Sequence, residues 1–503
     1  MVNRQKGKHV RVEIWLLMIT ALSLAVRLYH LDQQSLWFDE IFTLVMAQLP
    51  FYEGMIGLLG HGIQLTPFFH WIIKIWLFVG DTDWLVRFPS LLVGVLNVPM
   101  IFRLGKFYLN RNAGLLAALI FAINPFQVWY AQELKLYTLL SLASIGAMMS
   151  FGQLLHSQGK RGWGSLLFFN LIGFPTHYFM FLLSTVQFIY IVLLFKRTYF
   201  ILRPWLLAQG VAVLPLIPWW IFIIQIERSN VGIGWVPQPG ITTLFNTFWN
   251  FSFGYTGVFS TASVVSLVVM LIGLSSGVRK AWLDLKHGLL LSLWLFLPPL
   301  VTISLSFGRV SFYVDRYLLI VSPILTLLVV YGLLSFKSSF MRTVLFAVFV
   351  IATGIGLFNI YFDRTHFSKN DWRSLAHAIE ERSHDNDLVI TCTDGYLLAY
   401  DHYNPHQKIR VDGAVFAPQL YQIGASISGQ SVWIIVTHPL PSVHHFANLE
   451  PAEFDSSLLS TTAALWEIQN LKEVVTVSGI SAYRYSPTNL DTLKEVVAWR
   501  CGS

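Results

Sequence analysis

Apolar stretches of about 20 residues recur along the chain and are separated by short polar segments. A helix needs about that length of apolar sequence to cross the hydrocarbon core of a membrane. The 503 residues are 55% hydrophobic and only 12% charged, whereas soluble domains carry about 25% charged residues. We therefore predict an all-α polytopic membrane protein with about eleven spans. The predicted spans cover residues 12–30, 88–108, 112–131, 136–155, 164–177, 178–195, 204–225, 258–277, 287–306, 317–335 and 341–361.

Short loops rich in Lys and Arg set the sidedness, because such loops stay in the cytoplasm. With the basic N-terminus there are six such segments, and they alternate with loops that must lie outside. A basic head before the first stretch resembles a signal peptide, but no small-residue cleavage site follows, so we expect an uncleaved first span. The chain is thus expected in the plasma (inner) membrane, with a cytoplasmic N-terminus. The basic segments contain Arg4 to Arg11, Arg103 to Arg111, Lys160 and Arg161, Lys196 to Arg203, Arg279 to Lys286, and Lys337 to Arg342.

Residues 66–80 are also apolar, but counting them as a span would place every later basic loop outside. Their length of about 15 residues is short for a span. We therefore interpret 66–80 as a juxtamembrane or re-entrant helix inside an external loop over 31–87. The membrane domain is expected to cover residues 1–361.

The composition changes after about residue 362, where charged residues become frequent. An amphipathic helix is predicted at Arg373–Arg382, and short strands at Leu388–Thr391, Ser431–Thr437 and Ala482–Tyr485. Residues 362–503 are therefore expected to form a small extracytoplasmic α/β domain. The two cysteines, Cys392 and Cys501, have no metal-ligand spacing, and whether they pair is left open.

Carboxylates, cations and aromatic residues from distant parts of the sequence fall on the predicted external face. The acids are Asp39 and Glu40, directly after the first span, and Glu133. The other residues of this set are Arg87, Lys135, Tyr137, His177, Tyr178, Trp235, Arg309, Tyr313 and Arg316.

Nucleic acid is an unsuitable partner, because the basic residues of the chain form no continuous stripe.

These residue types suit sugar transfer from a lipid phosphate carrier. Such a donor releases an anionic phosphate at the membrane surface, and Arg or Lys side chains would stabilise that charge. A carboxylate would deprotonate the acceptor hydroxyl or amine. Inverting attack requires the base to lie opposite the leaving group.

Three motifs in this order resemble those of bacterial membrane glycosyltransferases of the protein O-mannosyltransferase type (glycosyltransferase family 39) and of the related aminoarabinose transferases. They are Ser35–Glu40, Arg87–Ser90 and Pro125–Tyr137. The resemblance covers roughly residues 12–335, and a further similarity lies at Asn370–Arg373. It implies a GT-C fold and a polyprenyl-phosphate-linked sugar donor.

The resemblance also implies residue roles. Asp39 would be the catalytic base with Glu40 in support, Glu133 would be a second acid of the site, and Arg316 would contact the donor phosphate. Arg87, Lys135 and Arg309 are the other candidate phosphate ligands. The candidate substrate-lining residues are Tyr137, His177, Tyr178, Trp235 and Tyr313.

Two departures from the family pattern bear on the site. The family often reads Glu-Ala-Arg-Met-Tyr where this chain has Glu133-Leu-Lys135-Leu-Tyr137, and lysine cannot bind phosphate bidentately. A His-Pro-Pro-Leu-like segment of the family corresponds here to Leu65-Thr-Pro-Phe68, which lacks the histidine.

The sequence leaves several alternatives open. A divalent cation could bridge Asp39, Glu133 and a donor phosphate, although Lys and Arg could supply the same charge. The acceptor could be a protein, a lipid or a glycan, with membrane lipids as further partners. A transporter or flippase of a lipid-linked saccharide is the main rival function; such proteins tend to carry ionisable residues near the membrane midplane, where they are scarce here.

Overall fold

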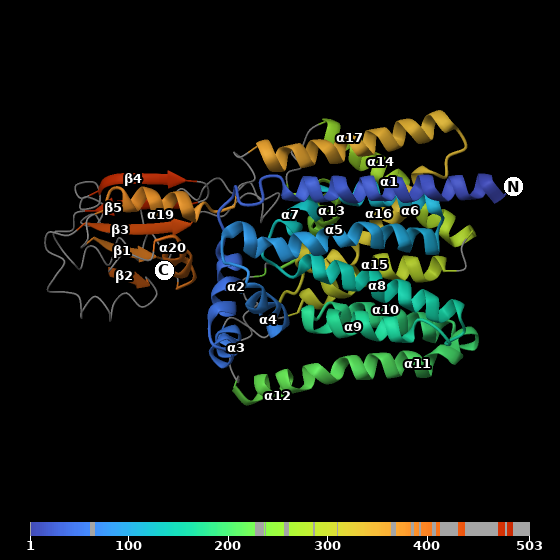
Figure 1. Cartoon of the computed structure of the whole chain (residues 1–503), viewed down its shortest axis with the longest axis horizontal. Coiled ribbons are helices and arrows are strands. Elements are labelled where there is room, and N and C mark those ends of the chain that lie inside the picture. Colours follow the sequence, from blue (N-terminus) through green and yellow to red (C-terminus); the bar gives the residue numbers. More distant parts are fainter. Residues whose placement is uncertain are drawn as a thin grey trace. The chain divides into compact units, whose positions relative to one another are not determined.

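The structure is a computed structural model of the whole chain. It describes residues 2–60, 66–226, 236, 238–255, 261–284, 287–308, 310–363, 369–383, 387–391, 394–404, 409–412, 431–437, 471–477 and 480–485. Figure 1 shows a large helical part and a smaller part that contains the strands.

The chain divides into two compact units. Unit 1 comprises Met1–Leu31 and Met46–Phe362, and unit 2 comprises Asp32–Val45 and Asp363–Ser503. The sequence analysis had assigned the whole of 31–87 to the membrane domain. The structure instead groups the start of that loop, which carries Asp39 and Glu40, with the chain after Phe362.

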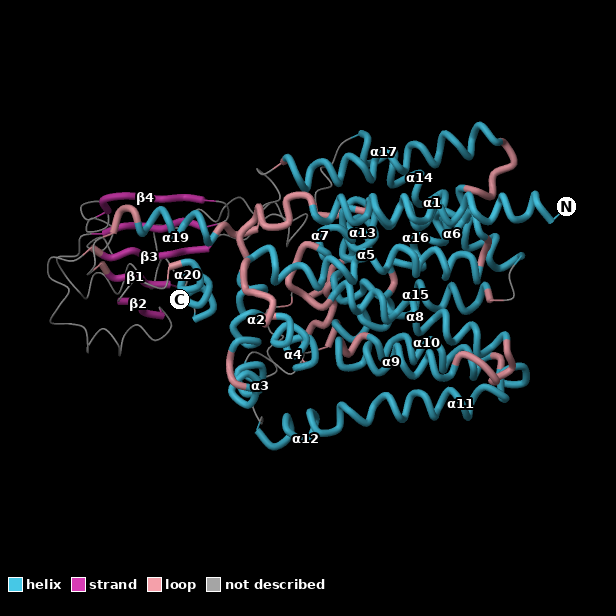
Figure 2. The backbone as a smooth tube through the Cα atoms, viewed as in Figure 1, coloured by secondary structure: helices cyan, strands magenta, loops and turns pink. Residues whose placement is uncertain are grey.

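Unit 1 is built from helices, most of which run side by side (Figure 2). Every apolar stretch that was predicted as a span coincides with one to three of these helices. They are α1 (Val2–Leu28), α3 (Phe51–Gly60), α4 (Pro67–Trp76), α5 (Asp83–Tyr108), α6 (Arg111–Ile123), α7 (Pro125–Ala131), α8 (Tyr137–His156), α9 (Trp163–Thr176), α10 (Met180–Leu193), α11 (Phe195–Val213), η1 (Leu214–Leu216), α12 (Ile217–Ile226), α13 (Ile241–Phe253), α14 (Thr261–Asp284), α15 (Gly288–Ser306), η2 (Asp315–Ile320), α16 (Ser322–Leu333) and α17 (Ser339–Phe362). The helix α2 (Phe38–Gln48) continues from unit 2 into unit 1.

Within the described residues, six helices are long and apolar enough to cross a membrane, and α6 with α7 would make a seventh if that bent pair is one span. These helices mark the chain as a membrane protein. The α10 and α16 helices are apolar but shorter. The count of eleven spans therefore stays a prediction.

The apolar segment 66–80 forms only the ten-residue helix α4. At 1.5 Å per residue such a helix is about 15 Å long, which is about half the thickness of the hydrocarbon core. Pro67 occupies its first turn, and the hydroxyl of Thr66 donates to the carbonyl of Pro175 at the end of α9. The helix is thus too short to span, as the sequence predicted.

Unit 2 contains a five-stranded mixed sheet in the order β2-β1-β3-β5-β4. The β1 and β3 strands pair in parallel. The β5 strand pairs antiparallel with β3 on one side and with β4 on the other. The predicted strands at Leu388, Ser431 and Ala482 are present, but β2 and β4 were not predicted. The elements are α19 (Trp372–Glu380), β1 (Leu388–Thr391), α20 (Asp394–Tyr403), β2 (Ile409–Asp412), β3 (Val432–Thr437), β4 (Leu471–Val477) and β5 (Ile480–Tyr485).

The α19 helix carries the predicted amphipathic pattern. Asp371 caps its start, with the side chain accepting from the backbone N–H of Ser374 at 3.1 Å. Leu375, Ala376 and Ile379 are buried on one face, at the spacing of a helix that covers a sheet.

Candidate active site

The predicted acid Glu133 follows a break between α6 and α7, where the chain bends by 58°. Pro125 at the break has no N–H, so the carbonyl of Phe121 four residues earlier loses its helical partner. The guanidinium of Arg27 donates to that carbonyl at 3.3 Å and to the carbonyl of Ala122 at 2.7 Å. Arg27 is fully buried on α1 and also donates to Ser23. The break is therefore satisfied by a charged side chain from another helix.

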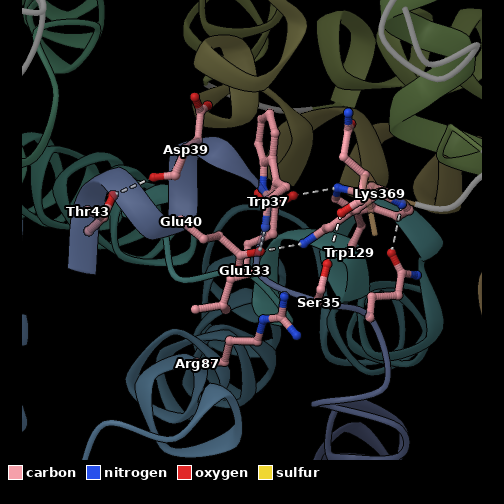
Figure 3. Close-up of polar contacts among 12 residues, drawn as sticks. Ser35, Trp37, Asp39, Glu40, Thr43, Arg87, Trp129, Glu133 and Lys369 are labelled. Atoms are coloured by element: carbon pink, nitrogen blue, oxygen red, sulfur yellow. Dashed lines mark hydrogen bonds and ion pairs between the residues drawn. The ribbon is translucent and has the colours of Figure 1, made fainter. Parts of the chain in front are cut away.

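Glu133 is buried, with 1% of its surface exposed. The indole Nε1 of Trp129 on α7 donates to its Oε1 at 2.8 Å (Figure 3). A buried carboxylate needs such donors because burial disfavours its charge. Unit 1 thus holds Glu133 in a fixed orientation directly after α7.

The two cations predicted beside Glu133 have different surroundings. Arg87 on α5 is 1% exposed and donates to the carbonyl of Leu31 at 2.9 Å. Lys135 is 9% exposed, and its backbone carbonyl accepts from the hydroxyl of Ser90 at 2.9 Å. The segment around Lys135 is thereby attached to α5, the helix that carries Arg87.

A polar network that the sequence analysis did not select surrounds Asp315. The side-chain amide of Asn250 donates to its Oδ2 at 2.7 Å, and the hydroxyl of Tyr255 donates to its Oδ1 at 3.0 Å. The Tyr255 hydroxyl is also bonded to that of Tyr130 on α7. Burial raises the pKa of Tyr255, and so does the negative charge of Asp315. Both tyrosines therefore act here as neutral hydrogen-bonding groups.

Arg316, the predicted phosphate contact, lies next to this network and is half-buried. Its guanidinium carbon is 5.8 Å from the centre of the Tyr317 ring. The ring of His177 lies 4.6 Å from the same tyrosine ring, and Tyr137 stacks on it at 6.5 Å. Unit 1 thus brings together Arg316, His177 and Tyr137, three residues that the sequence had placed on one face.

His177 is neutral at physiological pH. Burial lowers its pKa, and the charge of Arg316 acts in the same direction, so that the pKa falls to about 3. Its Nδ1 accepts from the backbone N–H of Phe179 at 3.1 Å, which requires that nitrogen to be unprotonated. His177 can therefore offer one N–H donor but carries no charge that would bind phosphate.

The sequence analysis also missed His70 on α4. Its Nδ1 lies 3.3 Å from the carbonyl of Thr66, and its buried Nε2 has no hydrogen-bond partner among the described residues. Burial lowers the pKa of His70 to about 3, and the charge of Lys135 acts in the same direction. The chain lacks the histidine that the His-Pro-Pro-Leu-like segment of the family has before its proline. It instead has a neutral histidine near Lys135, His70, three residues after Pro67.

The remaining candidates are distributed as follows. Tyr313 is buried and bonds to the hydroxyl of Thr247 on α13 at 2.8 Å. Tyr178 is partly buried in the turn between α9 and α10. Arg309, Trp235 and the cysteines Cys392 and Cys501 lie outside the described residues.

Asp39 and Glu40 belong to unit 2 and occupy the first turn of α2. Glu40 is fully buried, and its Oε2 lies 3.3 Å from the Nζ of Lys369, which is 7% exposed (Figure 3). Asp39 is half-buried, and its backbone carbonyl accepts from the hydroxyl of Thr43 at 2.8 Å. The two neighbouring acids thus differ in their surroundings.

A metal site was left open by the sequence. In the part of the chain that the structure describes, no three His, Cys, Asp or Glu side chains lie close enough together to hold an ion. The arrangement left open by the sequence uses two carboxylates, Asp39 and Glu133, together with a donor phosphate, so a divalent cation stays a prediction.

Comparison with known proteins gives a family match over part of the chain and a shared fold. Residues 64–222 match the family model described as dolichyl-phosphate-mannose-protein mannosyltransferase. A comparison with curated protein sequences finds no significant match. The break at Pro125, Glu133 and His177 all lie in the matched segment.

Two solved structures of ArnT from Cupriavidus metallidurans are similar over nearly the whole chain. The structure in the apo state has a TM-score of 0.57 at 13% sequence identity, covering 93% of this chain and 97% of that one. The structure bound to undecaprenyl phosphate has a TM-score of 0.55 at 12% identity, covering 94% and 98%. The sequence-based resemblance is confirmed: the chain has the GT-C fold of ArnT and resembles the membrane glycosyltransferases of the protein mannosyltransferase and ArnT type.

Proposed function

We propose that this protein is an inverting membrane glycosyltransferase that moves a sugar from a polyprenyl-phosphate carrier to an acceptor hydroxyl or amine. The observation that carries the proposal is the fold shared with ArnT, which has been solved with undecaprenyl phosphate bound. The match of residues 64–222 to the mannosyltransferase family supports the same chemistry. We further propose that the reaction takes place on the external face, as the sidedness of the basic loops favours.

Asp39 is the proposed base. It takes the proton from the acceptor as the acceptor oxygen or nitrogen forms a bond to the anomeric carbon of the sugar. The bond from that carbon to the phosphate oxygen breaks, and polyprenyl phosphate leaves with the electron pair. Attack from the face opposite the phosphate inverts the anomeric centre.

The leaving phosphate is assigned to Arg316 and Lys135. Arg316 is half-buried, and its planar guanidinium suits bidentate contact with a phosphate. Arg87 is a weaker candidate because it is almost fully buried and already donates to Leu31. Glu133 would then be a second polar anchor of the substrate, oriented by Trp129.

The test is transfer by the purified full-length protein with a panel of polyprenyl-phosphate sugars, followed by mass spectrometry of the lipid products. Wild type should release free polyprenyl phosphate, and Asp39→Asn should abolish release because the amide cannot accept the proton. Glu53→Gln is the matched control, since Glu53 is an exposed acid on the nearby helix α3. It should transfer at the wild-type rate.

Two results would overturn the proposal. Unchanged turnover in Asp39→Asn would remove Asp39 as the base. No turnover of any donor by wild type, despite saturable lipid binding, would favour a transporter of lipid-linked saccharides instead.

A further inference from the structure

The loop that carries Asp39 is bound by the chain after Phe362. Residues Asp32–Val45 form one compact unit with Asp363–Ser503, although more than 300 residues separate them in sequence. The hydroxyl of Ser35 donates to the backbone carbonyl of Asn370 at 2.9 Å, and the backbone N–H of Trp372 donates to the hydroxyl oxygen of Ser35 at 3.1 Å. Ser35 thus joins the loop to the start of α19 twice.

Three further contacts extend this attachment along the loop. The N–H of Leu36 donates to the hydroxyl of Tyr403 on α20 at 2.7 Å. The N–H of Lys369 donates to Gln34 at 3.1 Å. The guanidinium of Arg373 donates to the carbonyl of Asp32 at 3.2 Å. The loop backbone is therefore held from residue 32 to residue 36.

The centre of this contact is the ion pair between Glu40 and Lys369. Both side chains are buried, and Glu40 is 0% exposed. Its Oε2 also accepts from the N–H of Trp37 at 3.3 Å, the residue directly before α2. Glu40 at the third helical position thus supplies the side-chain half of a capping box, which fixes the start of the helix.

We propose that Lys369 is a positioning residue of the transferase: by pairing with Glu40 it holds the first turn of α2 and so orients Asp39. This inference rests on the proposed function, in which Asp39 is the base. Glu40 is then a structural acid. Successive helical side chains point about 100° apart, and Figure 3 shows the carboxylates of Asp39 and Glu40 pointing in different directions.

Three variants distinguish the effect of losing the ion pair from the effect of losing Glu40 or Lys369 alone. Lys369→Met leaves the buried Glu40 carboxylate without its cation, which is the costly case. Glu40→Gln keeps an acceptor for the N–H of Trp37 but removes the charge. The double variant Glu40→Gln/Lys369→Met removes both charges and keeps the cap, so it should be less impaired than Lys369→Met alone.

The control is Arg382→Met. Arg382 is also in unit 2, and it pairs with Glu473 on β4 at 2.9 Å, but this pair is partly exposed. Exposed pairs contribute little, so this variant should match wild type in both readouts described next.

Two readouts are needed. Hydrogen exchange of peptides covering residues 32–45, followed by mass spectrometry, reports whether the loop is held. Turnover of the polyprenyl-phosphate sugar that the wild type uses reports whether Asp39 is correctly oriented for catalysis. Lys369→Met should lose protection of the loop and lose kcat by about a hundredfold, the order expected from a misplacement of about 1 Å. KM for the donor should change by less than about threefold, because the donor phosphate is bound elsewhere.

The pH profile of kcat/KM is a third measurement, because a loss of structure lowers the rate without changing which group must be deprotonated. In the double variant the acidic limb should remain, because Asp39 is still the group that must be deprotonated. Loss of that limb would show that Glu40 is the base and would overturn the inference.

The inference also fails if Lys369→Met leaves both loop protection and kcat unchanged. If wild type turns over no donor, the proposed function fails, but the exchange experiment still decides whether Lys369 holds the loop. A Lys369→Met protein with wild-type protection would then overturn the positioning role by itself.

Discussion

Arg27 is the residue on which the geometry of unit 1 depends most directly. It is a fully buried cation on α1, and it supplies hydrogen bonds to the carbonyls of Phe121 and Ala122 at the break before Pro125. An unsatisfied buried carbonyl costs about 1–3 kcal/mol. The desolvation of the guanidinium opposes this gain.

We predict that Arg27→Met destabilises the protein by about 2–4 kcal/mol, because two carbonyls lose their partner. Thermal unfolding of the purified protein in detergent would show a lowered Tm. The control is Arg103→Met, since Arg103 is exposed on α5 and should change stability by less than about 0.5 kcal/mol. Equal Tm values for the two variants would contradict the role assigned to Arg27.

The charge state of His177 is determined by its burial and by its neighbour Arg316. Its pKa is lowered to about 3 by burial and by Arg316. The Tyr317 ring contacts both the neutral His177 and the charged Arg316. Of these two residues, only Arg316 carries a charge that suits the proposed contact with a phosphate, and His177 can offer one N–H.

At the scale of elements, glycine spacing decides how closely two helices approach. Gly273 and Gly277 lie four residues apart on α14 and face Gly332 on α16. A Cβ at Gly277 would overlap the carbonyl of Leu328, and one at Gly332 would overlap the carbonyl of Gly273. Small residues at this spacing let helix backbones come close in membranes, where packing provides much of the attraction.

Gly277→Ala should therefore force α14 and α16 apart and destabilise the protein by about 1–3 kcal/mol, as overpacking usually does. Gly210→Ala is the matched control on α11, because no atom lies within 4 Å of a Cβ built there. Chemical or thermal unfolding in detergent would compare the two. A Gly277→Ala protein as stable as Gly210→Ala would show that the helices can separate at no cost.

The break between α6 and α7 shows why a span-like sequence does not fix a straight helix. Residues 112–131 are mostly apolar and carry no charge, so hydropathy indicates one continuous span. The bend arises from Pro125 together with a cap, in which the Asn124 side chain accepts from the N–H of Gln127 at 3.0 Å. This local chemistry is readable from the sequence, but the buried Arg27 that makes the bend tolerable is a tertiary contact.

For the molecule as a whole, hydropathy predicted where the helices lie because membrane burial depends on composition over about 20 residues. It also separated α4 from the spans by length. The motif resemblance predicted the GT-C fold, which the similarity to ArnT confirms. These are properties of sequence segments and need no knowledge of how segments pack.

The polar contacts within the candidate site were less predictable. Asp315 directly precedes Arg316 in the sequence, but its partners Asn250 and Tyr255 lie 60 or more residues away. Lys369 lies 329 residues after Glu40, and no local pattern connects them. A lone Asn, Tyr or Lys in an external loop carries no signal of its own, so only the fold identifies these pairs.

The sidedness of the chain can be tested as a property of the whole molecule. Between Glu53 on α3 and Lys160 after α8, the candidate spans are α5, the bent pair α6 and α7, and α8. Three crossings put the two residues on opposite sides of the membrane. If α4 also crossed, four crossings would put them on the same side. The short length of α4 favours the first arrangement.

We therefore expect Glu53→Cys to react with a membrane-impermeant maleimide in right-side-out vesicles, and Lys160→Cys to react only after detergent is added. Both side chains are exposed, so neither should be hidden by packing. The background is the full chain with Cys392 and Cys501 replaced by Ser, so that each variant carries one thiol. Labelling of both positions from outside would mean that α4 or another segment crosses the membrane. Because Asp39 lies on the same loop as Glu53, labelling of Glu53→Cys only after detergent is added would place that loop inside and remove the support for transfer on the external face.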